Sequence, residues 1–249
     1  MRFDIVTLFP EMIEEAARHG VTGRAIDKGL VEIKLWNPRQ FTNDVHRTVD
    51  DRPFGGGPGM VMKFEPLQDT IQAIRADSNE PIRVIYLSPQ GRLITQEAMI
   101  RFSALPRIAM VAGRYEGLDE RLIEAEIDEE WSIGDYVLSG GELAALVVFD
   151  AVARLLPGVL GHAESARQDS HMTGLLDFPH YTRPDVVDGR AVPEILQSGN
   201  HAAIARWRLK QSLGRTWLRR PDLLAKLALD QIRRELLEEF QQEYLSESN

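Results

Sequence analysis

Hydrophobic and polar positions change their spacing several times along the chain, and each spacing predicts a different element. Apolar runs predict buried strands over residues 3–9, 83–87 and 107–113, and an apolar–polar alternation predicts a strand over residues 30–38. Helical spacing, with start and stop signals, predicts helices over residues 11–20, 64–77, 95–105 and 119–129. Strands that alternate with helices in this way predict an α/β fold with a parallel sheet.

The second part of the chain follows a different pattern. Residues 143–156 form the most apolar segment and predict a buried helix, which is too short to span a bilayer and is interrupted by Asp150 and Arg154. A polar, turn-rich stretch follows, and residues 192–244 return to helical spacing. We therefore expect an α/β domain over residues 1–160, a flexible interdomain linker over 161–176 and a small all-helical domain over 177–249.

The composition is that of a soluble globular protein, with 249 residues of which 43% are hydrophobic and 27% are charged. The absence of cysteine excludes disulfides, thiolate zinc sites and a cysteine nucleophile. The N-terminus carries no signal-peptide pattern, so we expect a cytoplasmic protein. The net charge is −9, yet residues 201–234 hold nine Lys or Arg against two Asp. That basic stretch is either a phosphate-binding face or a solvated helical surface, and charge alone does not decide between them.

Glycine-rich segments point to a ligand site. Residues 43–66 hold four glycines within positions 55–59 and no helical period, which predicts a long loop of the functional or mobile kind. Turns at residues 88–91, 113–117 and 133–141 each follow an apolar strand, and such turns meet at the carboxyl edge of a parallel sheet, where ligands bind. Each turn alone is also an ordinary strand-to-helix connection; together they favour a site.

The chemistry of these turns narrows the ligand. The chain has no dinucleotide fingerprint after its first strand, no P-loop, no zinc-binding helix motif and no serine-hydrolase elbow. The turns offer backbone amides, hydroxyls and the aromatic residues Tyr86, Tyr115 and Tyr136, and they contain few basic side chains. We expect an adenosine-like ligand without a phosphate chain.

Seven segments, taken in order, carry a family resemblance. They are FDIVTLFPEM, RPFGGGPGMVMK, YLSPQG, GRYEG, SIGDYVLSGGEL, LLDFPHYTRP and the stretch that begins VPEILQSGNH. In this order they resemble the bacterial tRNA (guanine-N1)-methyltransferases, the TrmD family of the SPOUT class. The resemblance implies transfer of a methyl group from S-adenosylmethionine to N1 of guanosine 37 of tRNA. It also implies a deep trefoil knot in the α/β domain, a homodimer with composite active sites, and a helical domain that binds tRNA.

The resemblance also implies roles for individual residues. The implied cofactor-binding residues are Tyr86, Leu87, Ser88, Pro89, Gln90, Gly113, Tyr115, Glu116, Gly117, Ile133, Gly134, Tyr136, Leu138, Gly140 and Gly141. The implied tRNA-binding residues of the loops are His46, Asp50, Gly59 and Ser165. For phosphate contacts we select the basic residues Arg206, Arg208, Lys210, Arg215, Arg219 and Arg220. Magnesium dependence is also suggested by the resemblance, although the sequence shows no cluster of metal ligands.

Asp169 resembles the general base of the family, and Arg154 resembles its partner. Guanine N1 is a poor nucleophile until it loses its proton, and an aspartate carboxylate is too weak a base to remove that proton unaided. A guanidinium near O6 stabilises the negative charge that develops there, so the pair suits the reaction better than either group alone. Without the resemblance, Asp169 is also compatible with a solvated linker acid and Arg154 with a surface arginine.

Two alternatives differ in chemistry. One is a related knotted methyltransferase that acts on another RNA target, such as a ribose 2′-hydroxyl, and analysis of the product would distinguish it. The other is a nucleotide-binding regulatory module without catalysis, which titration with S-adenosylmethionine and with ATP would separate from a methyltransferase.

Overall fold

The computed structural model describes residues 1–161 and 169–247. The chain divides into two compact units, Met1–Ala163 and Glu164–Asn249, and each is described by itself. No helix within the described ranges is long and apolar enough to cross a membrane.

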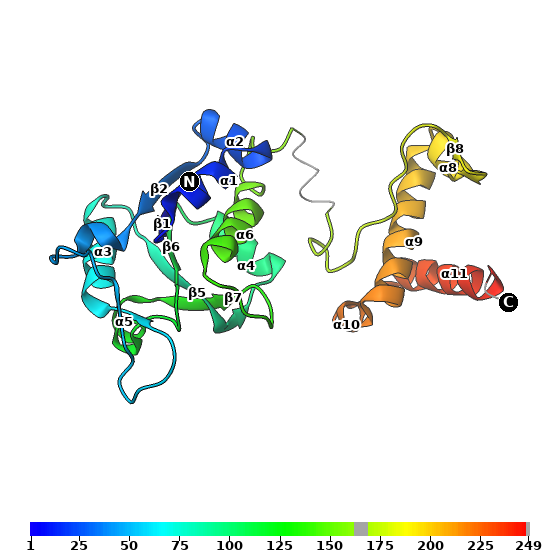
Figure 1. Cartoon of the computed structure of the whole chain (residues 1–249). Coiled ribbons are helices and arrows are strands. Elements are labelled where there is room, and N and C mark those ends of the chain that lie inside the picture. The colour runs from blue at the N-terminus through cyan, green and yellow to red at the C-terminus, as the bar shows by residue number, and fades with distance from the viewer. Residues whose placement is uncertain (162–168, 248–249) are drawn as a thin grey trace. The chain divides into compact units, whose positions relative to one another are not determined.

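The first unit is built on a five-stranded parallel sheet with the strand order β2-β1-β6-β5-β7 (Figure 1). Its strands are β1 (Arg2–Val6), β2 (Glu32–Trp36), β5 (Arg83–Leu93), β6 (Arg107–Ala112) and β7 (Glu129–Ser132). Its helices are α1 (Pro10–Ala17), α2 (Gly20–Asp27), α3 (Phe64–Ala76), α4 (Gln96–Ser103), α5 (Glu120–Glu126) and α6 (Glu142–Ala153), with a 3-10 turn η1 (Pro38–Phe41). A two-stranded antiparallel pair, β3 (Asp50–Asp51) and β4 (Val61–Met62), lies in the long loop.

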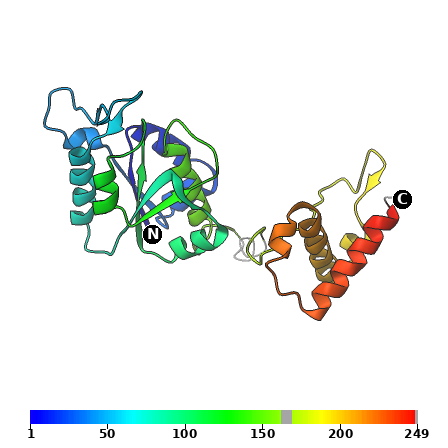
Figure 2. The ribbon, with the colours of Figure 1, turned by 90° about the horizontal axis from the view of Figure 1, so that it is seen from below.

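Helices cover both faces of the sheet (Figure 2). Alternate strand residues pack into the cores on opposite faces. In β6, Ile108 and Met110 pack in the core shared with α1, α2, α4 and α6, whereas Ala109 and Val111 pack in the core shared with α3 and α5. Phe3 meets Phe149 of α6 edge to face at 5.0 Å between ring centroids. The predicted α/β fold with a parallel sheet is confirmed.

Several element boundaries differ from those predicted. The helix expected over residues 11–20 ends at Ala17, and Gly20, with a φ of +66°, begins a second helix that was not predicted. The strand expected before the turn at residues 133–141 was given no residue range, because the four residues of β7, two of them Glu, extend the helical pattern of the preceding segment. Strand β5 continues to Leu93, because residues 88–91 bulge between two pairings with Trp131.

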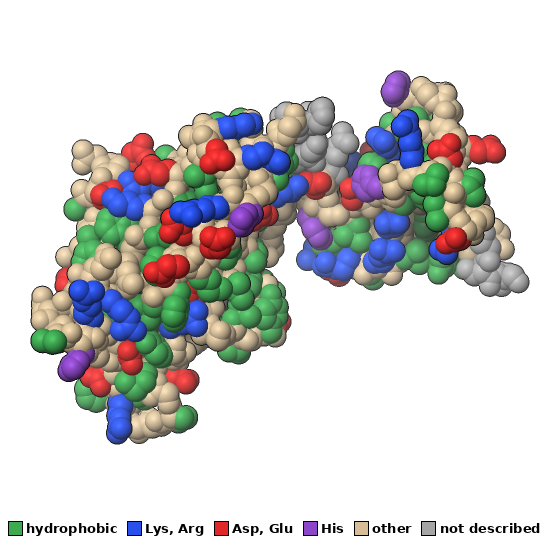
Figure 3. Space-filling view, turned by 45° about the horizontal axis from the view of Figure 1, so that its top comes forward, with side chains coloured by type: hydrophobic (Ala, Val, Ile, Leu, Met, Phe, Trp, Pro, Cys, Tyr) green, Lys and Arg blue, Asp and Glu red, His purple; other side chains and the backbone are tan. Residues whose placement is uncertain are grey.

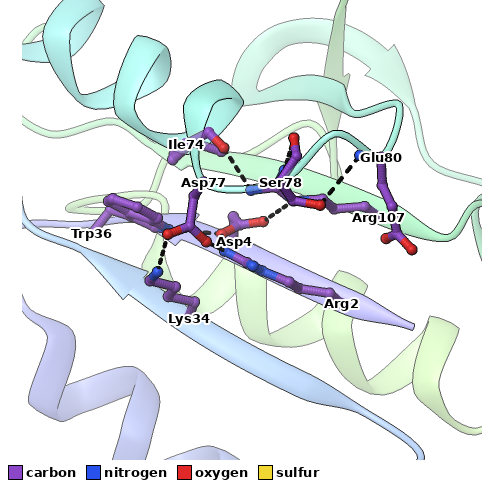
Figure 4. A network of polar contacts seen from close by, with 9 residues as sticks. All are labelled: Arg2, Asp4, Lys34, Trp36, Ile74, Asp77, Ser78, Glu80 and Arg107. Atoms are coloured by element: carbon purple, nitrogen blue, oxygen red, sulfur yellow. Dashed lines mark hydrogen bonds and ion pairs between the residues drawn. The ribbon is translucent and has the colours of Figure 1, made fainter.

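A partly buried network of charged residues lies at the amino-terminal ends of the strands (Figure 4). Asp4 and Arg107 are fully buried and form an ion pair at 2.7 Å, and Arg107 also donates to the Ile74 carbonyl at 2.6 Å. Hydrogen bonds from Lys34, at 2.5 Å, and from Arg2 hold the pKa of Asp77 at about 2. This network lies at the end of the strands opposite the glycine-rich turns, so it supports the sheet without lining the candidate site.

The second unit contains helices around a small leucine core. Its helices are α8 (Glu194–Gln197), α9 (His201–Arg219), α10 (Pro221–Leu224) and α11 (Gln231–Glu247), and its hairpin joins β8 (Val186–Val187) to β9 (Arg190–Ala191). Leu175, Leu213 and Leu236 form the core. Part of the predicted linker belongs to this unit, because Leu175 is buried and the Leu176 amide donates to the Thr216 hydroxyl at 2.9 Å.

Candidate active site

A pocket opens at the carboxyl ends of β5, β6 and β7, where the three glycine-bearing turns meet. It encloses about 770 Å³ of atom-free space, part of it open to solvent. The structure brings every predicted cofactor-binding residue to this pocket except Gln90, which is exposed on the bulge of β5. The lining also includes Arg114, Trp131, Ser132, Val137 and Ala144, which the sequence analysis did not select.

Trp131 and Ser132 were not selected because the strand expected before residue 133 was not assigned to particular residues. Once a strand is placed at Glu129–Ser132, its last residues stand directly before the turn that begins at Ile133. Arg114 lies inside a recognised motif, but its role comes from contacts with segments far away in the sequence. Two sequence features therefore pointed to residues of this group: a strand before residue 133, and the motif segments that contain Arg114, Ser132 and Val137.

Close backbone approach explains the glycine at position 141. Its amide donates to the Gly113 carbonyl at 2.8 Å, which holds the start of α6 against the end of β6. A Cβ at position 141 would lie 2.7 Å from the Ala112 Cα, closer than non-bonded carbons pack. Glycine therefore lets two walls of the pocket touch through their backbones.

Tyr86 lines the pocket beside the turn at residues 113–117. Its side chain is buried, and burial, reinforced by the charge of Glu130, raises the pKa of the phenol. A Cβ at Gly113 would lie 2.8 Å from the Tyr86 ring, so this glycine leaves room for the ring. Tyr86 is thus a neutral hydrogen-bonding group at neutral pH.

Arg114 joins the pocket turns to one another. Its Nε donates to the buried Glu142 carboxylate at 2.9 Å, and one terminal nitrogen donates to the Ser139 carbonyl at 3.1 Å. The guanidinium lies 4.4 Å from the Phe9 ring centroid, and the Thr7 hydroxyl donates to the other Glu142 oxygen at 3.0 Å. One arginine therefore connects the end of β6, the 133–141 segment and the turn after β1.

The long loop packs against the turn at residues 113–117. The Glu116 amide donates to the Met60 carbonyl at 2.9 Å, and the Met62 amide donates to the Gly117 carbonyl at 2.9 Å. Tyr115 has a φ of +60°, and burial together with the neighbouring Asp50 carboxylate raises the pKa of its phenol. The loop therefore places Asp50 beside one wall of the pocket.

The other loop residues predicted to bind tRNA are placed as follows. A Cβ at Gly59 would lie 2.3 Å from a Glu116 carboxylate oxygen, so Gly59 also lies at the pocket turn. His46 is exposed in a tight turn in which its amide donates to the Asp44 carboxylate at 3.0 Å. No contact brings His46 to the pocket among the described residues, and Ser165 lies outside them.

The two predicted catalytic residues belong to different units. Arg154 follows the last residue of α6, and its amide donates to the Asp150 carbonyl at 3.1 Å. Asp169 is half-buried in the second unit, where it lines a cavity together with Thr173, Phe178 and Arg208.

The basic stretch of the second unit is partly neutralised. Arg206 pairs with Glu239 and Lys210 with Glu243, both at 2.6 Å, so the acidic helix α11 balances the charge of α9. Arg220 pairs with Asp222 at 2.7 Å. Arg208, Arg215 and Arg219 form no ion pair with any described carboxylate. Figure 3 shows basic and acidic side chains interspersed on the face in view.

Comparison with known proteins identifies the family. The profile described as "tRNA (Guanine-1)-methyltransferase TrmD" matches residues 1–226. The chain is also 68% identical over 249 residues to a tRNA (guanine-N(1)-)-methyltransferase of Methylococcus capsulatus, covering 100% of this chain and 99% of that protein. The chain belongs to the TrmD family. Proteins of the same name from Halorhodospira halophila and Proteus mirabilis are 61% and 59% identical, over 99% and 98% of this chain and 94% and 98% of their own lengths.

A methyltransferase of the TrmD family implies S-adenosylmethionine, and the pocket fits this group. Leu87, Ile133 and Leu138 supply apolar walls, while the close glycine turns leave backbone groups accessible beside them. The described residues include no group of three or more His, Asp or Glu placed to hold a metal ion.

Proposed function

We propose that this member of the TrmD family transfers a methyl group from S-adenosylmethionine to N1 of guanosine 37 of tRNA. The observation that carries the proposal is the pocket at the carboxyl edge of the sheet, which gathers nearly all the residues that the family resemblance implies for the cofactor. Membership of the family supports methylation of guanine N1 in tRNA. That the methylated guanosine is at position 37 is our proposal.

We propose that the pocket turns belong to a trefoil knot. After β7, at the edge of the sheet, the chain returns past β5 to the end of β6, where Arg114 bridges Gly140 and Gly141 donates to Gly113. Helix α6 then starts against β6 instead of beside β7. This return of the chain supports a knot, which would hold the pocket walls in a fixed arrangement.

The cofactor, when bound, supplies an electrophilic methyl group on a sulfonium, which is already a good leaving group. Asp169 takes the proton from guanine N1, and Arg154 stabilises the negative charge that develops on guanine O6. The location of Asp169 in the second unit supports a base that reaches the site only when the tRNA is docked. Asp50 and Gly59, which the loop holds at the pocket turn, contact the nucleotides around the target.

A homodimer completes this site. Leu143 and Val147 are each 49% exposed, and they lie one turn apart on α6. Phe9 and Met12, at the start of the neighbouring α1, are also exposed. These apolar side chains support an interface between two copies, because monomeric proteins rarely leave such clusters in water.

The decisive experiment is methyl transfer to tRNA transcripts that carry guanosine or adenosine at position 37. We expect N1-methylguanosine only with guanosine. Asp169→Asn should lower kcat by about 10²–10⁴ while the affinity for S-adenosylmethionine in calorimetry stays unchanged. Asp188→Asn, at an exposed hairpin turn of the same unit, is the matched control and should keep full activity.

An equal loss of turnover and cofactor affinity in Asp169→Asn would show that Asp169 does not serve as the base. Methylation of a ribose hydroxyl, or of transcripts that carry adenosine at position 37, would refute the proposed substrate.

A further inference from the structure

A second large cavity lies in the helical unit, and neither of the two proposed catalytic residues lines it. It is bounded by the extended segment 178–185, by α8 and by the first half of α9. It encloses about 1100 Å³ of atom-free space, part of it open to solvent. Phe178, His180, Tyr181, Arg183 and Arg208 line it together with aliphatic side chains.

The aromatic side chains of this cavity are held in place. The Arg208 guanidinium lies 4.7 Å from the Phe178 ring centroid, and the His180 ring lies 4.7 Å from the same centroid on a tilted plane. The Asp177 carboxylate lies 2.9 Å from His180 Nε2 and fixes that ring. Tyr181 is 49% exposed, so it presents a ring surface to solvent. Fixed rings of this kind are stacking surfaces for unpaired bases.

The charges of the cavity favour an anionic ligand. Arg183 and Arg208 form no ion pair with a carboxylate within residues 1–161 and 169–247, unlike Arg206 and Lys210 on the same unit. Asp185 contributes one carboxylate to the lining, so the positive charge of the two arginines exceeds the negative charge of this acid. Guanidinium groups that lack a carboxylate partner bind phosphate through paired hydrogen bonds.

Position links this cavity to the proposed reaction. Phe178 and Arg208 line both this cavity and the one that Asp169 lines, so the two cavities share a wall. A nucleotide bound in the aromatic cavity would therefore be a near neighbour of a nucleotide at Asp169. The proposed methylation of guanine N1 does not itself require this second cavity.

We propose that this aromatic–arginine cavity binds an unpaired nucleotide of the tRNA loop that neighbours the target guanosine. The base stacks on the Tyr181 ring, and Arg208 and Arg183 hold its phosphates. The Asp185 carboxylate and the Gln197 amide, both on the lining, face the hydrogen-bonding edge of the base. The inference rests on the proposed function and adds a second point of contact with the same substrate.

The test measures tRNA affinity of the full-length protein with transcripts that carry one abasic nucleotide at a time around the target. Tyr181→Ala should weaken binding of the intact transcript by about 5- to 150-fold, the range for loss of one stacked base. Tyr181→Phe keeps the ring and should bind like the wild type. One abasic position should weaken binding to the wild type but have no further effect on Tyr181→Ala.

Salt dependence tests the phosphate contact. Arg208→Gln should reduce the slope of log affinity against log salt by about 0.7, the value for one phosphate of a single strand. Arg233→Gln, on α11 and away from both cavities, is the matched control and should keep the full slope.

Two results would overturn the inference. One is a wild-type affinity in Tyr181→Ala with every transcript, and the other is an altered oligomeric state with unchanged tRNA affinity, which would assign the cavity to protein contacts. Wild-type protein is assayed for N1 methylation in the same preparation. Failure of that assay refutes the proposed function, whereas normal methylation with an unaffected Tyr181→Ala refutes only this inference.

Discussion

Glu142→Gln probes the polar chain that holds the pocket turns together. The Glu142 side chain is 1% exposed and accepts hydrogen bonds from Thr7 and from Arg114. Glutamine has nearly the same shape but no charge, and its terminal amide keeps one acceptor oxygen for the two donors that Glu142 satisfies. Arg114 would then lose its carboxylate partner in a buried setting.

Removal of one partner of a buried ion pair costs about 3–5 kcal/mol. Arg114 is 20% exposed and keeps its bond to the Ser139 carbonyl, so we place the loss at about 2–3 kcal/mol. For a unit of this size that corresponds to a fall in Tm of about 4–12 °C. Because the same arginine holds the 133–141 segment, the KM for S-adenosylmethionine should also rise.

Urea denaturation and thermal unfolding measure the stability, and initial rates at varied S-adenosylmethionine measure the KM. Glu14→Gln provides the control, since it removes the same charge from an exposed helical ion pair with Arg18 and should cost under about 0.5 kcal/mol. The reasoning fails if Glu142→Gln unfolds within about 0.5 kcal/mol of the wild type, or if both variants lose the same stability.

Three further predictions concern the sheet and the pocket. Asp4→Asn should lower the free energy of unfolding by about 3–5 kcal/mol, because it leaves Arg107 buried without a carboxylate; a loss below about 1 kcal/mol in urea would contradict this. Asp77 has its pKa lowered to about 2, so its stabilising contribution is complete above the ordinary aspartate range, about pH 4, and is lost as the pH falls toward 2. The stability gap between wild type and Asp77→Asn should therefore be constant near neutrality and shrink in acid. Gly141→Ala, with its Cβ 2.7 Å from the Ala112 Cα, should displace a pocket wall and weaken S-adenosylmethionine binding in calorimetry, and unchanged affinity would disprove the close-approach argument.

The pattern along the chain was sufficient to predict the parallel sheet and the edge at which the glycine-bearing turns meet. Apolar runs predict β1 and β6 within a few residues, and the glycines in the segments after β5 and β6 predict turns at one edge. The pattern along the chain did not locate β7, because its acidic residues continue the helical pattern of the segment before it. Pairing with β5, not local preference, makes that segment a strand.

Apart from β7, local sequence determined most of the strands, helices and turns of this protein, because burial and backbone preference act over a few residues. Only the tertiary structure decided which distant groups meet. The bond from Arg114 to Glu142, the approach of Gly141 to β6 and the shared wall at Phe178 and Arg208 each join segments separated along the chain. Such contacts depend on how the elements pack, and a pattern of single residues carries no information about which partner a buried charge or ring will find.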